Sequence, residues 1–172
     1  MPRLQEPDCL LNAYIYKQWE FVSATRKYLA DLILGIFKER KDDHLYAEKL
    51  ATASSELIEN AYKYSPADTD FHVMLLRSED AITLQVRNYV ESSGPEVLKL
   101  IQEEIQLVYR EADPREAFKR KVLASLSDQS GKSMLGYAKI RLETGALIHA
   151  DLEGGELLVI TAVFPLEPLP LR

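Results

Sequence analysis

The segment whose residue types and spacing could carry chemistry is SELIENAYKYS, at positions 55–65. At about 100° of rotation per residue in a helix, Glu56, Asn60 and Lys63 fall within an arc of roughly 60°. There a carboxylate could orient a water or hydroxyl, an amide oxygen could ligate a cation such as Mg²⁺, and an ammonium could contact a phosphate. The same spacing fits an ordinary polar helix flank with a charge pair, so the residues alone leave both interpretations open.

These side chains must be positioned by a helix, which the pattern predicts at about 43–64. Its apolar residues recur at intervals of three or four and form a single stripe: Tyr46, Leu50, Ala53, Leu57, Ala61 and Tyr64. Ser65-Pro66 ends this helix because proline disfavours helical conformation in the residue before it. The polar arc lies beside the stripe, at the rim where a helix would meet the edge of a cleft.

The remaining elements predict an α+β fold. Strands are expected at 8–16, 71–77, 81–88, 146–151 and 156–164, and the last two are joined at Gly154-Gly155, a good tight-turn pair. A helix at about 17–40 carries Phe21, Tyr28, Leu32 and Ile36 at helical spacing, and another begins near 133. Hairpin strands give a mostly antiparallel sheet, and the amphipathic helices should cover one of its faces as a two-layer sandwich.

Length and composition place the chain in a broad class. Its 172 residues fit one domain, 1–172, with a core at 17–165, a charged helical insert at about 95–126 and an extended tail at 166–172. The net charge is -6, and acids interrupt the densest basic stretch at 119–121, so nucleic acid is not expected as a partner. No apolar run is long enough to span a bilayer and no signal-peptide core is present, so we expect a cytoplasmic protein without membrane attachment.

Several motifs together resemble one family. SELIENAYKYS is similar to the asparagine-containing helix motif of the GHKL superfamily, the histidine-kinase-like ATPases with a Bergerat fold. LQVRN, at 84–88, falls where that family places the strand with its adenine-binding aspartate. SGKSMLG, at 130–136, is similar to the glycine-rich lid motif, and a long helix and a GG-turned hairpin follow. The resemblance covers about residues 17–165 and is closest in style to the anti-sigma-factor serine kinases of bacterial partner-switching systems.

The resemblance implies a Mg-ATP site and a role for each matching residue. Glu56 would activate the attacking hydroxyl or water, Asn60 would hold Mg²⁺, and Lys63 would approach the phosphates. Tyr64 would line the adenine side or the core. The adenine and lid positions of the family fall on Asn88, Lys132, Ser133, Leu135 and Gly136.

The sequence also departs from the family pattern. The family reads adenine with an aspartate, and the neutral Asn88 makes a weaker contact than a carboxylate. Val90 and Ser92 stand where glycines are expected, and a β-branched residue resists positive φ. Ser133 and Met134 replace lid residues that should allow close backbone approach. Lys132 could compensate as a point charge or could simply be exposed.

These observations favour a signalling protein that regulates a protein partner by docking, with ATP binding weakened or lost. The alternative is an active Mg-ATP-dependent serine/threonine protein kinase of the partner-switching type. A third interpretation is an α+β interaction domain whose polar cluster is only a helix flank. The resemblance is also compatible with a homodimer.

Overall fold

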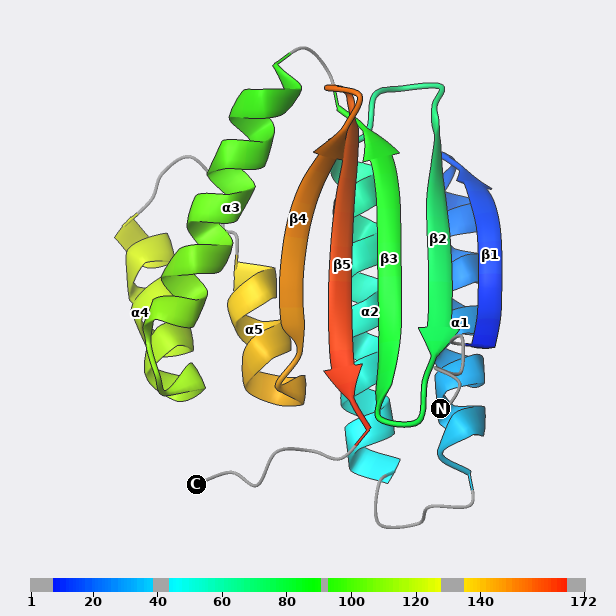
Figure 1. The fold of residues 1–172 in the computed structure, drawn as a ribbon, viewed down its shortest axis with the longest axis horizontal. Helices are drawn as coiled ribbons and strands as arrows, with labels where there is room; N and C mark the ends of the chain where they lie inside the picture. Colours follow the sequence, from blue (N-terminus) through cyan, green and yellow to red (C-terminus); the bar gives the residue numbers. More distant parts are fainter. Residues whose placement is uncertain (1–7, 39–43, 91–92, 128–134, 167–172) are drawn as a thin grey trace, which may run out of the picture.

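The computed structural model describes residues 8–38, 44–90, 93–127 and 135–166. Five strands and five helices follow one another along this part of the chain (Figure 1). They are β1 (Asp8–Tyr16), α1 (Trp19–Ile36), α2 (His44–Tyr64), β2 (Asp70–Arg77), β3 (Ala81–Tyr89), α3 (Gly94–Arg110), α4 (Pro114–Ser127), α5 (Leu135–Thr144), β4 (Leu147–Glu153) and β5 (Leu157–Pro165). The predicted order of elements is confirmed, and α3 and α4 lie in the region of the insert.

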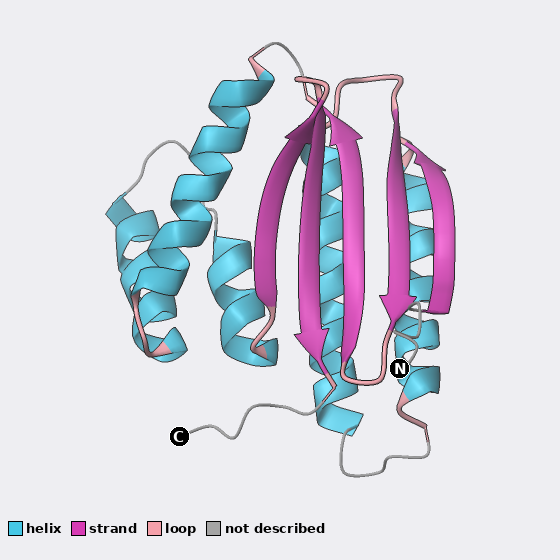
Figure 2. Cartoon of the chain, in the orientation of Figure 1, coloured by secondary structure: helices cyan, strands magenta, loops and turns pink. Residues whose placement is uncertain are grey.

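The strands form one sheet in the order β1-β2-β3-β5-β4, and every neighbouring pair is antiparallel. Helices α1 and α2 lie behind this sheet, while α3, α4 and α5 lie on the side of β4 (Figures 1 and 2). The predicted α+β two-layer sandwich is therefore confirmed. None of the described helices is long and apolar enough to cross a membrane.

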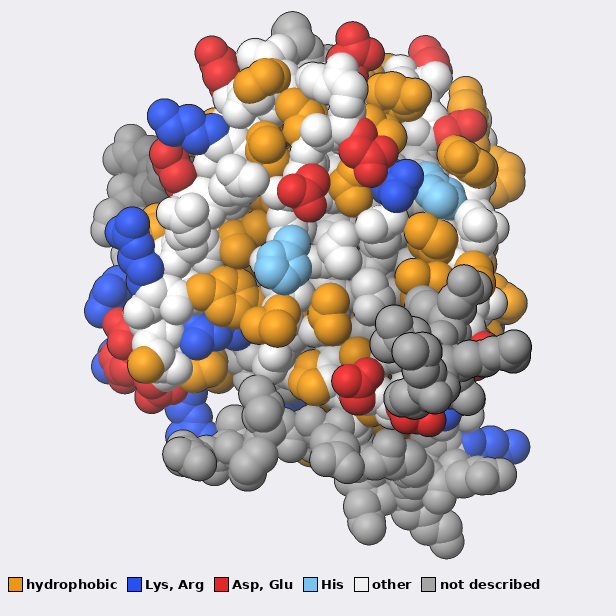
Figure 3. Space-filling view, viewed as in Figure 1, with side chains coloured by type: hydrophobic (Ala, Val, Ile, Leu, Met, Phe, Trp, Pro, Cys, Tyr) orange, Lys and Arg blue, Asp and Glu red, His pale blue; other side chains and the backbone are white. Residues whose placement is uncertain are grey.

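The core lies between the sheet and α2. Successive side chains of a strand point to opposite faces, so Ile82, Leu84 and Val86 of β3 all face the helices and are fully buried or nearly so. Leu50 and Ile58 of α2 are buried against them. On the opposite face of the sheet, apolar and polar side chains are mixed (Figure 3). The sheet is thus apolar on one side, which fixes its register against the helix layer.

Helix α1 packs through a different face from the one that its predicted spacing selected. Phe21 and Tyr28 are each 54% exposed, and the residues that pack into the core are Val22, Leu29 and Ile33. The helix carries two apolar stripes, and both have intervals of three, four or seven residues. Periodicity therefore predicts the helix correctly but does not determine which stripe meets the sheet.

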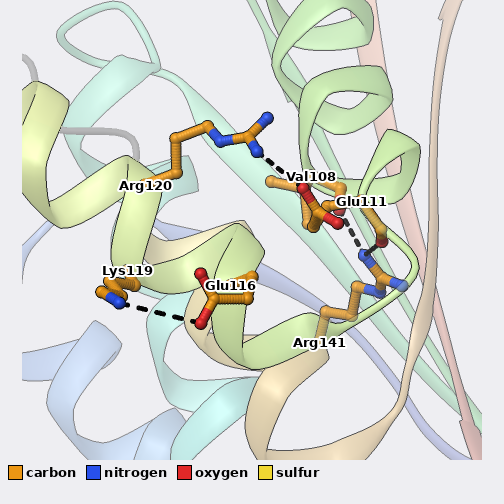
Figure 4. A network of polar contacts seen from close by, with 6 residues as sticks. All are labelled: Val108, Glu111, Glu116, Lys119, Arg120 and Arg141. Atoms are coloured by element: carbon orange, nitrogen blue, oxygen red, sulfur yellow. Dashed lines mark hydrogen bonds and ion pairs between the residues drawn. The ribbon is translucent and has the colours of Figure 1, made fainter.

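The corner between α3 and α4 is fastened to α5 by Arg141 (Figure 4). Its guanidinium donates to the backbone carbonyls of Val108, Glu111 and Ala112, and the last two hydrogen bonds measure 2.8 and 3.3 Å. Arg120 of α4 donates to the Glu111 carboxylate at 2.7 Å. Several carbonyls at the end of α3 are satisfied in this way, so the insert has a defined position beside α5.

Candidate functional site

A cavity of about 290 Å³ lies between α2, the sheet and α3. Helix α2 contributes Leu57, Asn60, Ala61 and Tyr64, which share one face because they are spaced by three or four residues. The sheet contributes Val86, Asn88, Leu158 and Ile160, α3 contributes Val97, Leu100 and Ile101, and Val90, Gly136 and Tyr137 complete the lining. None of these side chains is charged. The cavity is therefore an apolar space with a few amide and phenol groups.

Glu56 lies one turn before Asn60 on α2, and its carboxylate forms an ion pair with Lys139 of α5. The side chains of Glu56 and Lys139 are 25% and 37% exposed. The hydrogen bond to Glu56 is the largest influence on Lys139 and raises the pKa of its ammonium. The proposed base is therefore neutralised by a cation that the sequence analysis did not select.

Asn60 and Gly136 meet beside this ion pair. A Cβ atom built on Gly136 would lie 3.5 Å from Oε2 of Glu56 and 3.7 Å from Nδ2 of Asn60. The first turn of α5, which begins at Leu135, therefore approaches the polar arc of α2 closely. Of the predicted site residues, Glu56, Asn60 and Gly136 are brought together at one place.

Lys63 does not line the cavity. Its ammonium lies 3.9 Å from the carboxylate of Glu59, one turn earlier on α2, and its side chain is 60% exposed. Glu59 also forms an ion pair with Arg26 of α1. Lys63 therefore pairs with the same carboxylate that links α2 to α1. Tyr64 does line the cavity, and at 51% exposure it stands at the opening.

Asn88 lies on the cavity wall at the end of the buried row of β3. It is 3% exposed, and its side-chain amide donates to the carbonyl of Tyr89 at 3.0 Å. Val90, at a position where the resembling family has glycine, also lines the cavity. An isopropyl group therefore occupies space where close backbone approach was expected. Lys132 and Ser133 lie outside the described residues.

Two features of the site were missed by the sequence analysis. Lys139 follows Gly136 by three residues, so its place one turn along α5 could have signalled that it faces α2. Tyr137 lines the cavity at 7% exposure, and its burial raises the pKa of the phenol to about 12, with Tyr64 and Glu104 adding to the effect. The part of the cavity wall that α3 forms could not be predicted from the sequence. An apolar stripe indicates that a helix packs on something, but not which element it packs on.

Comparison with known proteins supports the fold. No protein-family model and no curated protein sequence matches this chain. A chain in the crystal structure of the SiaB–SiaC complex from Pseudomonas aeruginosa has a similar structure, with a TM-score of 0.68 and 16% sequence identity. The similarity covers 91% of this chain and 89% of that chain. At this identity the likeness shows a shared fold.

Proposed function

We propose that this chain is a regulatory protein of the histidine-kinase-like ATPase fold, which acts by binding a protein partner and binds Mg-ATP weakly or not at all. The observation that carries the proposal is the cavity lining, which contains no charged side chain among the described residues. The structurally similar chain was solved in a complex of two proteins, which supports partner binding as the mode of action.

The weak binding of ATP follows from charge. A triphosphate requires cations or a set of free N–H groups to compensate its negative charge. Lys139 is paired with Glu56, and Lys63 is paired with Glu59. A volume of about 290 Å³ is also at the lower end for ligand pockets. The described residues therefore do not fit a triphosphate well.

Isothermal titration with Mg-ATP tests this part of the proposal. We expect no saturable binding in the micromolar range for the unaltered chain. The double variant Asn88→Asp with Val90→Gly introduces on the cavity wall the carboxylate and the glycine that the resembling family has at these positions. It should bind Mg-ATP more tightly than the unaltered chain. A micromolar dissociation constant for the unaltered chain would overturn the claim of weak binding.

Capture on the immobilised chain from the native host, with and without Mg-ATP, should retain the same partner in both cases.

A second function is favoured by the meeting of Glu56, Asn60 and Gly136. Their closeness supports a Mg-ATP-dependent serine/threonine kinase, in which Glu56 would be the base, Asn60 a metal ligand and Gly136 a point of close backbone approach. In that case Glu56 would accept the proton of the attacking hydroxyl, while Lys139 holds the other oxygen of the same carboxylate.

Phosphate transfer from labelled ATP to proteins of the native host tests the kinase. Glu56→Gln should abolish the transfer, whereas Glu59→Gln, on the same helix and paired with Arg26, should retain it. Labelling that is equal in the unaltered chain and in Glu56→Gln would contradict this function. If partner binding alone is the function, none of the three proteins transfers the label.

A further inference from the structure

The cavity between α2, the sheet and α3 has a buried aliphatic floor and an exposed rim. Leu57, Val86 and Leu158 form part of the floor, and all three are buried. Tyr64 and Leu100 are the large exposed side chains of the lining, at 51% and 57% exposure. A ligand would therefore enter past these two side chains and lose most of its contact with water inside.

Polar groups are few in the lining. The amide of Asn88 donates an N–H group to the carbonyl of Tyr89, which leaves its own carbonyl oxygen as an acceptor. The hydroxyl of Tyr137 and the amide of Asn60 form no hydrogen bond to another described residue. The cavity therefore offers a ligand a small number of neutral donors and acceptors.

The charges beside the lining are already compensated. Glu56 on α2 is paired with Lys139, and Glu104 on α3 is paired with Lys121. Glu104 is close enough to Tyr137 to contribute to the raised pKa of its phenol. A charged ligand of either sign would leave water without gaining a free counter-charge, and that transfer is costly.

The size of the cavity limits the ligand further. An apolar cavity of about 150 Å³ takes benzene, and this one measures about 290 Å³. It has room for a molecule of about two rings. An apolar molecule of that size gains stability by burial against the aliphatic floor.

We propose that this cavity binds a neutral, mainly apolar small molecule of about two-ring size, which carries one or two hydrogen-bonding groups. Its apolar body lies on the aliphatic floor, and its polar groups meet the Tyr137 hydroxyl and the Asn88 amide. Such a ligand differs in charge and in size from the Mg-ATP that the family resemblance implies. The ligand class rests on that part of the proposed function which concerns ATP, and it is independent of partner binding.

Three probes with the same rings, substituted at the same position, test the preference for a neutral ligand. Naphthol is uncharged near neutral pH, whereas naphthalenesulfonate carries a negative charge and naphthylmethylammonium a positive one. Calorimetric titration of the unaltered chain should show saturable binding of naphthol, with a dissociation constant at least tenfold lower than that of either charged probe. Equal affinity for the three probes, or no saturable binding of naphthol below about 1 mM, would overturn the proposal.

Adenosine separates this ligand class from a nucleoside site in the same titration. It should bind more weakly than naphthol, and tighter binding of adenosine would overturn the proposal. Mg-ATP titration reports on the proposed function separately, because naphthol can fail to bind while Mg-ATP binding is also weak.

A larger side chain at the rim tests where naphthol binds. Leu100→Trp narrows the opening from an exposed position, and should weaken naphthol binding at least tenfold. Leu107→Trp is the matched control, since Leu107 lies two turns later on α3, is 52% exposed and does not line the cavity. It should bind naphthol as the unaltered chain does, and circular dichroism establishes that both variants are folded. Equal effects of the two substitutions would place the naphthol site elsewhere and overturn the proposal.

A cation at the rim gives a gain of binding that misfolding cannot imitate. Leu100→Arg should raise the affinity for naphthalenesulfonate about tenfold, because the sulfonate then finds a counter-charge at the opening. Leu107→Arg should leave that affinity unchanged. An affinity for naphthalenesulfonate that does not rise in Leu100→Arg, or that rises equally in both variants, would contradict binding in this cavity.

Discussion

At the scale of single residues, the decisive contact is the ion pair between Glu56 and Lys139. Both side chains are partly exposed, so the pair contributes little to stability by itself. Its consequence is geometric, because the Lys139 ammonium occupies one of the two carboxylate oxygens that could accept a proton. The other oxygen, Oε2, faces Gly136 and is the atom through which Glu56 could take a proton from a substrate.

Part of this site could be predicted from the sequence. Glu56 and Asn60 could be placed together because the angle between positions on a helix is fixed. Lys63 was assigned to the same arc, but Glu59 precedes it by four residues and offers an ion pair within the helix. The lysine side chain is long and can extend either toward Glu59 or toward the cavity. Spacing alone therefore could not predict which of the two directions Lys63 takes.

At the scale of elements, the start of α3 is fixed by a close contact with the β4–β5 turn. A Cβ atom built on Gly94 would lie 2.2 Å from the carbonyl oxygen of Gly155 and 3.1 Å from Cδ2 of Leu152. Backbone on both sides must move to relieve such an overlap. This contact therefore sets the position of the helix that forms one wall of the cavity.

We predict that Gly94→Ala lowers the free energy of unfolding by about 1–3 kcal/mol, as overpacking does elsewhere. Gly136→Ala is the matched control, since its Cβ would meet its nearest neighbours at ordinary contact distances of 3.5 and 3.7 Å. Its effect should stay within about 0.5 kcal/mol. Urea unfolding followed by circular dichroism measures both values. Equal stability of the two variants would show that the start of α3 can shift without cost.

Most elements could be predicted because their patterns are local. The apolar stripe of α2 predicted 43–64 and the helix occupies His44–Tyr64, while the strand predicted at 8–16 is β1 without change. The packing of α1 could not be predicted in the same way. Phe21 and Val22 begin two stripes of similar character, and only the complementary surface of the sheet and α2 selects between them.

At the scale of the whole molecule, the sheet order depends on contacts that are distant in the sequence. The hairpins β2–β3 and β4–β5 follow from their short turns. The pairing of β3 with β5 joins residues such as Leu84 and Ala162, and no local pattern encodes it. The antiparallel sheet as a class was therefore predictable, whereas the order of its strands depends on tertiary packing.

The alkaline stability of the whole molecule should depend on Tyr137. The phenol is 7% exposed, and burial raises its pKa from 10.0 to about 12. The unfolded chain therefore releases this proton at a lower pH than the folded chain does. Between about pH 10 and pH 12 the unfolded state binds fewer protons, so the free energy of unfolding falls as the pH rises. Below pH 10 both states keep the proton, and the group has no effect.

We predict that Tyr137→Phe removes this loss. The slope from one such group is at most about 1.4 kcal/mol per pH unit. The stability of the unaltered chain should therefore fall relative to that of Tyr137→Phe by about 1–3 kcal/mol between pH 9 and pH 12. Urea unfolding of both proteins at a series of pH values measures the difference, and all other titrating groups are common to the two. A difference that stays constant with pH would show that water reaches the phenol, and hence that the cavity wall beside α5 opens in the folded protein.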